Sequence, residues 1–282
     1  MPRTIQEIAQ EIRFLYGVVP SEQFDPETAV NTRVAYLKTF LRNTGRKAYV
    51  LGISGGVDSS VTGKLCQMAV EQLRAENYDA TFVAMRLPAD IQRDEQDAQK
   101  ALAFINPDVT LIVNVGPAST LMHIQAVQEF ERIGRRQTAA QQDFNKGNMK
   151  ARLRMCAQYE QAAQFEGLVI GTDHNAEAVM GFFTLFGDGA CDLTVLNGLN
   201  KRQIRRIAQY LQAPESVWAK PPTADLEELS PGKLDDEGFG FSYEYLDDFL
   251  EGKSIPDEVL VKLTAQYERT MFKRNPIPGF RA

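Results

Sequence analysis

The sequence predicts an α/β protein built on a doubly wound, Rossmann-like parallel sheet, with extra helices at both ends of the chain. Short apolar runs of strand type lie at 48–53, 80–85, 109–113 and 168–170, and stretches of helical period separate them. Strands that alternate with helices of about 10–15 residues are typical of βαβ units, whose parallel sheet is buried between helices. The Gly-Gly pair at 55–56, directly after the first run, predicts a tight turn from strand to helix.

Two helices are expected before the first strand. In the first, apolar residues recur at steps of three and four, as Ile5, Ile8, Ile12 and Leu15. A proline-containing break at 20–26 follows, and the second helix is expected over about 27–42. Because both helices precede any strand, we expect them to form an appendage to the core or part of an interface.

The segments between the strands predict the helices that cover the sheet. Helical patterns lie at about 59–73, 94–104 and 148–165. The segment 134–147 is polar and has no clear period, so we expect a flexible loop there.

The C-terminal part predicts a different organisation. Residues 214–240 are rich in proline, glycine and acids and are expected to form a long irregular loop, of a length that is usually functional or disordered. A last helix is expected over about 256–274. We interpret 1–282 as one domain, with N-terminal helices to about residue 45, an α/β core over about 46–215, and C-terminal loop and helices over about 216–282.

The composition is typical of an acidic globular enzyme. With 31 Lys and Arg against 37 Asp and Glu, the net charge is −6 and the pI about 5.2, which argues against a nucleic-acid partner bound through phosphate contacts. No apolar run approaches the roughly 18 residues of a membrane span, and the start MPRTIQEIAQEIR lacks the apolar stretch of a signal peptide. Three cysteines without CxxC spacing favour a reducing compartment, so we expect a cytoplasmic protein without a membrane partner.

The segment Leu-Gly-Ile-Ser-Gly-Gly-Val-Asp-Ser-Ser at 51–60 is the clearest functional motif. Glycines let backbone N–H groups approach an anion, and the N-terminus of the following helix adds further donors. The hydroxyls of Ser54, Ser59 and Ser60 are additional donors. A bare phosphate would repel Asp58, so its presence indicates a divalent cation between them. The spacing is not that of a Walker A loop, and the alternative is a tight turn before a capped helix.

A second motif follows the strand at 168–170. It reads Gly-Thr-Asp-His-Asn-Ala-Glu at 171–177, which predicts a strand end and then a helix that carries Glu177. Parallel strands present their carboxyl ends at one edge, so Thr172, Asp173 and Glu177 are expected to face the loop. Asp58 and Glu177 then form a plausible pair of oxygen ligands for Mg²⁺. In the alternative interpretation, Asp173 caps the helix and Glu177 lies on a solvated face.

Together these motifs carry a resemblance. Ser-Gly-Gly-Val-Asp-Ser-Ser resembles the pyrophosphate loop of the ATP pyrophosphatase superfamily, a motif that leaves several members open. With the second motif and the stretches at 199–203, 220–227, 246–253 and 272–274, the chain resembles the ammonia-dependent NAD synthetases over about 12–276. The resemblance implies an adenine-nucleotide hydrolase-like fold, a homodimer, and conversion of deamido-NAD, ATP and ammonia to NAD, AMP and pyrophosphate through a nicotinate acyl-adenylate.

The resemblance also assigns roles to residues. ATP is expected to contact Gly52, Ile53, Ser54, Gly55, Gly56, Val57, Asp58, Ser59, Thr172, Lys201 and Thr223. The Mg²⁺ ligands are expected to be Asp58 and Glu177, and the contacts to deamido-NAD Arg152, Asp192 and Lys273. Asp173 is the candidate for receiving ammonium and removing a proton. Arg86, at the end of a strand, is expected either to reach ATP or to pair with a surface acid.

Two positions depart from the family pattern. Leu185 and Phe272 stand where the family usually has Lys and often has His. Losing a cation that meets an anionic substrate weakens binding, so either another cation replaces it or the substrate is the mononucleotide form of nicotinate. A non-catalytic nucleotide-binding protein is a further alternative. A tRNA-thiolating enzyme would need a cysteine pair, or an RNA-binding module and a basic surface, and none is visible.

The length of the chain and several single residues allow further predictions. The chain is too short for a glutaminase domain beside the core, so free ammonia or a separate partner is the expected source. The arginines at 202, 205 and 206 are expected on one solvated helix face. Cys66 is expected in the core and His123 on a helix surface, and two histidines without a cysteine partner make a zinc site a poor interpretation.

Overall fold

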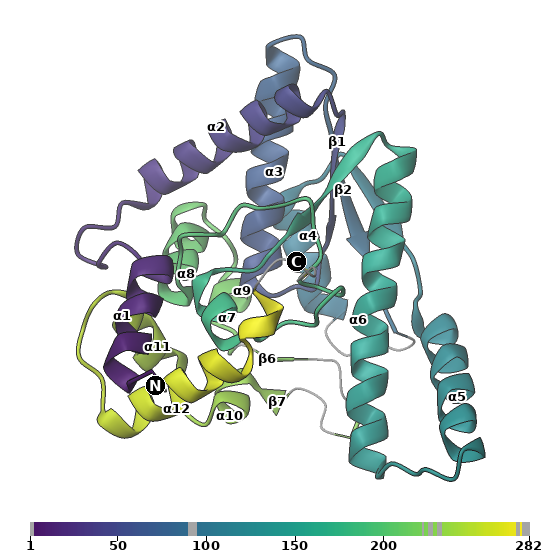
Figure 1. Cartoon of the computed structure of the whole chain (residues 1–282). Helices are drawn as coiled ribbons and strands as arrows, with labels where there is room; N and C mark the ends of the chain where they lie inside the picture. The colour runs from purple at the N-terminus through teal and green to yellow at the C-terminus, as the bar shows by residue number, and fades with distance from the viewer. Residues whose placement is uncertain are drawn as a thin grey trace, which may run out of the picture.

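The computed structural model describes residues 3–89, 95–221, 223–224, 228–229, 233–274 and 277. In this part of the chain, a parallel sheet of five strands in the order β3-β2-β1-β4-β5 forms the centre (Figure 1). The strands are β1 (Ala48–Gly52), β2 (Thr81–Arg86), β3 (Val109–Ile112), β4 (Gly167–Gly171) and β5 (Leu193–Thr194). The prediction of an α/β protein with a parallel sheet is confirmed, and β5 is an addition to the expected strands.

The strand order reverses beside β1. The chain builds outward from β1 through β2 to β3 and then returns to place β4 on the other side of β1. Val50 of β1 lies opposite Val169 of β4, so the two strands run in register toward the same edge of the sheet. Ligands of open α/β sheets bind at the carboxyl ends of the strands at such a reversal. Both functional motifs follow these two strands.

Helices cover both faces of the sheet, as a doubly wound fold requires. One face packs on α2 (Pro26–Thr44), α3 (Val57–Ala75), α4 (Glu95–Ile105) and α8 (Lys201–Tyr210). The other packs on α6 (Ala139–Gln164). Alternate strand residues point to opposite faces: Tyr49 and Leu51 belong to the first cluster, and Val50 belongs to the second. Helix α2 is therefore part of the core, and not an appendage.

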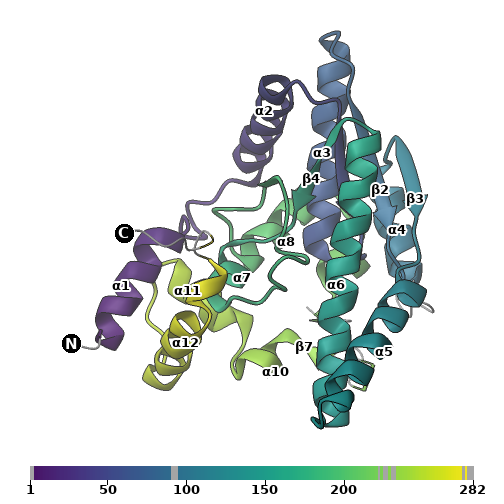
Figure 2. The same cartoon turned by 45° about the vertical axis from the view of Figure 1, so that its right-hand side comes forward.

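A second group of helices lies beside the sheet. Helix α1 (Ile5–Tyr16) buries its apolar face against α7 (Asn175–Met180), α11 (Tyr243–Leu250) and α12 (Asp257–Arg269), far along the chain (Figure 1). The 3₁₀ turn Met271–Lys273 follows α12. On the opposite side of the molecule, α5 (Gly116–Arg132) packs along the N-terminal half of α6 (Figure 2). Within the described residues, no helix is long and apolar enough to span a bilayer.

Two expected loops contain regular structure. Helix α6 begins at Ala139, well inside the expected loop at 134–147, because Thr138 and Gln141 form a capping box. Most of this first stretch faces solvent, so no apolar period marks it. The expected irregular segment 214–240 contains short elements, namely α9 (Glu215–Trp218), β6 (Thr223–Ala224), its antiparallel partner β7 (Lys233–Leu234) and α10 (Asp235–Phe239).

Candidate active site

The loop after β1 packs its backbone closely against the first turn of α4. Gly55 has a φ of 90°, and a Cβ at this position would lie 2.9 Å from the backbone nitrogen of Ala98. Glycine is required there for both reasons. The hydroxyls of Ser54 and Ser59 lie 3.1 Å apart, and the Ser54 N–H donates to Ser59 Oγ at 3.3 Å. The loop is thus fixed by its own hydroxyls and by its contact with the first turn of α4.

Two neighbouring elements hold the loop in place. The N–H of Gly52 donates to Gln158 Oε1 of α6 at 2.7 Å. On the other side, Arg86 at the end of β2 is 1% exposed and donates to the carbonyl oxygen of Ile53 at 3.3 Å. The same guanidinium pairs with Glu95 at 2.7 Å. Of the two interpretations of Arg86, the pairing with an acid is confirmed, and the contact with ATP stays a prediction.

A cluster of charged side chains lies where the two motifs meet. Asp58 comes from the first turn of α3, His174 and Glu177 from the start of α7, and Lys201 from the first turn of α8. Lys201 Nζ donates to Asp58 Oδ2 at 2.6 Å and lies 3.7 Å from Glu177 Oε1. His174 Nε2 lies 3.4 Å from Glu177 Oε1. Lys201 and His174 are 3% and 1% exposed, whereas the side chains of Asp58 and Glu177 are 19% and 15% exposed, so the two carboxylates stay within reach of a ligand.

The donor atoms of this cluster fit a divalent cation. One ligand atom each from Asp58, His174 and Glu177 can be chosen so that all three lie within 4.8 Å of one another. Among the described residues, the buried Asp58 Oδ1 has no hydrogen-bond partner. A buried carboxylate oxygen without a partner is costly unless a cation meets it. Two carboxylates are the oxygen ligands that Mg²⁺ prefers, so the residues present fit the predicted metal.

The carboxyl groups around this cluster titrate differently. Burial by itself would raise the pKa of Glu177, but the charges of His174 and Lys201 outweigh it and lower the pKa to about 2. Asp173 follows β4 directly. Its burial and the nearby charges of Glu177, Asp188 and Asp58 raise its pKa well above the usual value. Glu177 is therefore ionised at neutral pH, whereas the raised pKa of Asp173 makes its carboxyl group hold a proton more readily than an ordinary aspartate does.

The predicted substrate contacts form a second group. Arg152 Nε donates to the carbonyl oxygen of Leu185 at 3.3 Å, and Lys273 Nζ donates to those of Gly181 and Phe183 at 2.8 and 2.7 Å. Both cations thus hold the segment that follows α7. Asp192 lies at the end of this segment.

The carboxylate of Asp192 joins two strands and α6. It accepts the N–H of Val169 at 2.7 Å and the hydroxyl of Tyr159 at 3.4 Å. The structure therefore brings Asp58, Glu177 and Lys201 together and places Arg152, Asp192 and Lys273 around 181–192.

Four further positions belong to the predicted site or depart from the family pattern. Thr172 is half-buried at the end of β4. Thr223 begins β6, but its side chain lies outside the described part of the structure. Of the positions that depart from the family pattern, Leu185 is half-buried and Phe272 is 64% exposed.

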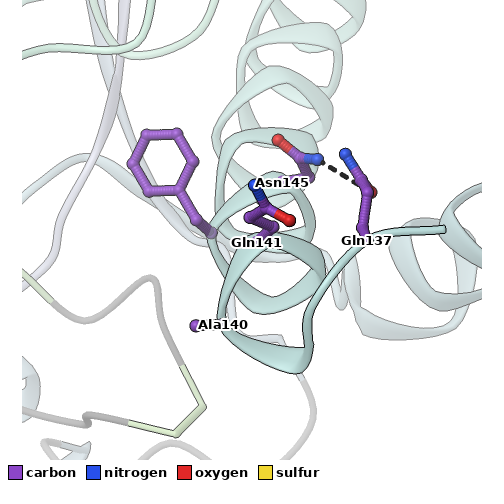
Figure 3. A pocket seen from close by; sticks show the side chains of 5 residues that line it. Gln137, Ala140, Gln141 and Asn145 are labelled. Atoms are coloured by element: carbon purple, nitrogen blue, oxygen red, sulfur yellow. Dashed lines mark hydrogen bonds between the residues drawn. The ribbon is translucent and has the colours of Figure 1, made fainter.

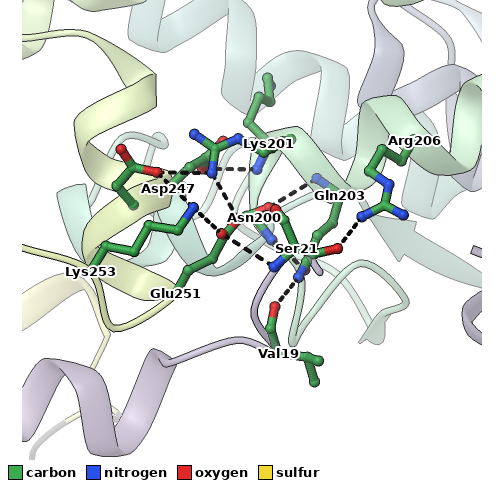
Figure 4. A network of polar contacts seen from close by, with 11 residues as sticks. Val19, Ser21, Asn200, Lys201, Gln203, Arg206, Asp247, Glu251 and Lys253 are labelled. Carbon is green, nitrogen blue, oxygen red and sulfur yellow. Dashed lines mark hydrogen bonds and ion pairs between the residues drawn. The ribbon is translucent and has the colours of Figure 1, made fainter. Parts of the chain in front are cut away.

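Sequence reasoning missed one residue of the cluster and misjudged two arginines. His174 was given no role, although its place three residues before Glu177 puts both on one face of a helix. The solvated face expected for the arginines of α8 is wrong. Arg202 pairs with Asp248 and Glu251, each at 3.0 Å. Arg206 donates to the carbonyl oxygen of Ser21 (Figure 4) and to that of Phe24.

A cavity also lies away from this cluster. It has a volume of about 360 Å³ at the start of α6 and is lined by Gln137, Ala140, Gln141, Phe144 and Asn145 (Figure 3). Asn145 Nδ2 donates to Gln137 Oε1 at 3.2 Å across its wall. The lining carries no ionisable group, so the charged cluster is the better candidate for catalysis.

Known proteins share both the sequence and the fold. The family model described as NAD synthase matches residues 29–277. A Burkholderia lata protein named NH(3)-dependent NAD(+) synthetase is 51% identical over 257 residues, which are 90% of this chain and 89% of that protein. The crystal structure of NAD+ synthetase from Burkholderia pseudomallei has a TM-score of 0.81 at 45% identity and covers 97% of this chain and 98% of its own.

A third match carries a different printed name. The structure of NMN synthetase from Francisella tularensis has a TM-score of 0.77 at 31% identity, covering 92% of this chain and 100% of its own. The family model thus extends over both groups of site residues. The chain belongs to the NAD synthase family.

Proposed function

We propose that this protein amidates deamido-NAD with free ammonia, consuming ATP and giving NAD, AMP and pyrophosphate. The observation that carries the proposal is the cluster of Asp58, Glu177 and Lys201 directly beyond the Ser-Gly-Gly-Val-Asp-Ser-Ser loop, at the strand-order reversal of a NAD synthase-family fold. The reaction has two steps, and a different group of residues supports each.

In the first step, the nicotinate carboxylate attacks the α-phosphorus of ATP and pyrophosphate leaves with the electrons of the broken bond. Negative charge builds on the phosphate oxygens. The backbone N–H groups of 52–59, the hydroxyls of Ser54 and Ser59, and the ammonium of Lys201 are the donors that stabilise this charge. Because these groups are already held in place by protein contacts, little reorganisation is needed during the reaction. Arg86 contributes by holding the carbonyl group of Ile53.

Asp58 and Glu177 would hold a Mg²⁺ ion beside these groups. When bound, the ion neutralises phosphate charge and favours departure of pyrophosphate. The low pKa of Glu177, about 2, keeps this ligand ionised at any pH at which the enzyme would work. Thr172 and Thr223 are proposed ATP contacts by resemblance.

In the second step, ammonia attacks the acyl carbon of the nicotinate adenylate and AMP leaves. Asp173 is the proposed group that receives ammonium and accepts a proton from it. Its raised pKa supports this role, because an approaching cation stabilises the ionised carboxylate and a carboxylate with a raised pKa is a stronger base.

For the substrate we propose Arg152, Asp192 and Lys273, which surround 181–192, as contacts. Leu185 lies among them and carries no cation. This loss, and the similarity to a protein named NMN synthetase, support a second candidate reaction, the same chemistry on nicotinate mononucleotide. A smaller acceptor would need fewer cations, so the two candidates differ in substrate and not in mechanism.

We also propose a homodimer. Helices α5 and α6 lie together at one side of the molecule (Figure 2). These helices and the C-cap of α5 expose large apolar side chains, namely Leu121, Met122, Ile124, Ile133 and Phe144. Several large apolar side chains exposed on neighbouring elements are a feature of protein interfaces. Light scattering at micromolar concentration is expected to give twice the 31.6 kDa of one chain, and a monomeric mass would contradict the dimer. The single domain and the cytoplasmic location stay predictions.

The test is product formation by the purified protein with ATP, Mg²⁺ and ammonium, in parallel with deamido-NAD and with nicotinate mononucleotide. NAD and AMP in equal amounts from deamido-NAD are expected. Turnover with the mononucleotide alone would support the second candidate. No AMP from either acceptor, with ATP still bound, would refute both and favour a nucleotide-binding protein without this activity. The Glu177→Gln variant is the negative control.

A further inference from the structure

The stretch Leu-Asp-Asp-Phe-Leu-Glu-Gly-Lys at 246–253 has no role in the reaction as described above. It forms the end of α11 and the following turn, and it lies against the start of α8 (Figure 4). Two of its carboxylates are almost fully buried, Asp247 at 3% and Glu251 at 6% exposed. Buried carboxylates are rare unless their oxygens are satisfied, so the partners of these two groups are informative.

Asp247 binds the backbone at the first turn of α8. Its Oδ1 accepts the N–H of Lys201 at 3.2 Å, and its Oδ2 accepts the N–H of Arg202 at 2.8 Å. These amides are among the N–H groups that have no acceptor within their own helix. A carboxylate at this end also interacts favourably with the helix dipole. One carboxylate thus fixes the backbone of Lys201 and of its neighbour.

Glu251 fixes the residue that precedes this turn. Its Oε1 accepts a hydrogen bond from Asn200 Nδ2 at 3.0 Å, and Asn200 is the N-cap of α8. Glu251 also accepts a hydrogen bond from Ser21 at 2.7 Å and pairs with Arg202 and with Lys253 (Figure 4). The cap and the first turn are therefore tied to α11 through two separate carboxylates.

The side chain of Lys201 leaves from this fixed backbone and ends in the catalytic cluster. Its Nζ lies 2.6 Å from Asp58 Oδ2, on the far side of the turn from Asp247. A displacement of the first turn of α8 would change the position that this ammonium can reach, because the side chain starts from that backbone and is almost fully buried where it meets Asp58. A shift of about 1 Å in a positioned group is sufficient to weaken its contribution to catalysis strongly.

We propose that Asp247 is a positioning residue for Lys201, with Glu251 and Asn200 supporting the same turn, so that α11 aligns the ammonium with the phosphates of ATP. The inference rests on the proposed function only in naming ATP as the ligand of Lys201. The competing explanation is that Asp247 merely stabilises the packing of α8 on α11. In that case, replacing Asp247 would lower the stability of the folded protein, and any effect on ATP binding would not depend on the presence of Lys201.

Binding of ATP with Mg²⁺, measured by titration calorimetry on the full chain, separates these explanations. Asp247→Asn keeps the size of the side chain and removes the charge and one acceptor. We expect it to raise the Kd for ATP at least fivefold. Asp248→Asn is the matched control, because Asp248 is next on the same helix and pairs with side chains of Arg202 and Lys253. We expect it to change the Kd less than twofold.

A double-mutant cycle with Lys201→Met then tests the route of the effect. If Asp247 acts through Lys201, Asp247→Asn changes the Kd less than twofold once Lys201 is already replaced. An equal loss in both backgrounds would overturn the proposal, since Asp247 would then support the site without Lys201. An unchanged Kd in Asp247→Asn alone would also overturn it.

If Asp247→Asn does not fold at the temperature of the titration, Asn200→Ser takes its place in the same cycle. Serine is an N-cap as good as asparagine, but it lacks the amide that donates to Glu251. The proposal is supported if Asn200→Ser raises the Kd for ATP threefold or more and this rise disappears in the Lys201→Met background. It is overturned if Asn200→Ser raises the Kd by the same factor in both backgrounds. The turnover assay of the unmodified protein tests the proposed reaction separately. If no NAD forms but the double-mutant cycle still shows that the effect of Asp247 depends on Lys201, the proposed reaction is refuted and this inference stands.

Discussion

Lys201 Nζ donates a hydrogen bond to Asp58 Oδ2 at 2.6 Å, across 143 residues of sequence. The ammonium therefore lies on the carboxylate that is the proposed ligand of a divalent cation. It also lies 3.7 Å from the second proposed ligand, Glu177. Two cations drawn to the same pair of carboxylates repel each other, at about 4 kcal/mol for unit charges 4 Å apart at an effective dielectric constant near 20. In the absence of nucleotide, Lys201 and the metal ion thus compete for the same two carboxylates. When ATP is bound, its negatively charged phosphates lie between the two cations and reduce their repulsion.

Replacing Lys201 is expected to have opposite effects on metal binding and on catalysis. In Lys201→Met, binding of Mn²⁺ to the nucleotide-free protein should tighten roughly three- to tenfold, because a competing charge is removed. Turnover should fall at least a hundredfold, because a donor to the phosphates is lost. Electron paramagnetic resonance of free Mn²⁺ measures the first effect. Lys64→Met is the control, since Lys64 donates to the carbonyl of Phe104 and is not part of the cluster. Weaker Mn²⁺ binding in Lys201→Met would contradict the competition.

The meeting of Asp58 and Glu177 was predictable from the sequence, for a simple reason. Each follows a strand of one parallel sheet, and parallel strands end at one edge, so two local motifs determine one site. The fold class follows from the same local alternation of strands and helices. The start of α6 was not predictable from periodicity, because its first residues face solvent on most sides and only the cap formed by Thr138 marks it.

Other contacts depend on packing that no local pattern encodes. Asp247 meets the first turn of α8 because α11 crosses it, and nothing in the stretch at 246–253 indicates which helix its carboxylates will face. Arg202 and Arg206 look like surface residues in sequence, yet their partners are a distant carboxylate and the backbone of the break near Ser21. Such contacts join segments far apart in sequence, so they become visible only in three dimensions.

The loop glycine at position 55 is predicted to tolerate no side chain. In Gly55→Ala, the new alanine would keep a φ of 90°, which is unfavourable for a residue with a side chain. Its Cβ would also lie 2.9 Å from a backbone atom of α4, which is a steric clash. We expect a loss of about 3 kcal/mol in the free energy of unfolding and at least tenfold weaker ATP binding.

Gly45→Ala is the matched control for this prediction. Gly45 has a φ of 66° and no atom within 4 Å of the added Cβ. It therefore isolates the cost of the backbone conformation, about 1 kcal/mol, and should leave ATP binding unchanged. Urea denaturation and ATP titration measure the two effects. Equal losses in both variants would show that contact with α4 is unimportant.

Leu185 offers a test of the substrate. It lies in the segment held by Arg152 and Lys273, at a position where the resemblance to the family predicts a lysine. Leu185→Lys should lower the KM for deamido-NAD three- to tenfold, because a new cation would meet an anionic acceptor. Leu185→Gln has similar reach without charge and should not reproduce the effect. If Leu185→Lys leaves the KM for deamido-NAD unchanged, the position does not contact the substrate.

The buried carboxylate of Glu251 predicts a specific dependence of stability on pH. Burial would raise its pKa, but hydrogen bonds from Lys253, Ser21 and Asn200 and the charge of Arg202 lower it to about 2. In the unfolded chain the pKa of glutamate is about 4.3. A lowered pKa in the folded state stabilises the protein at pH values above the unfolded pKa, by about 3 kcal/mol here. This contribution is lost as the pH falls from about 4.3 towards 2.

Glu251→Gln removes the charge and should reveal that contribution by difference. At pH 7 the variant is expected to unfold about 2–3 kcal/mol more easily than the unmodified protein. The difference should shrink steadily below pH 4.3, because the unfolded chain then binds a proton at Glu251 while the folded protein, with a pKa of about 2 at this group, does not. Urea denaturation at pH 7, 5 and 3.5 measures this trend. Glu244→Gln changes an exposed carboxylate of the same helix and should show little difference at any of these values. A difference for Glu251→Gln that stays constant with pH would mean that its cost is the loss of packing and not of the ionised carboxylate.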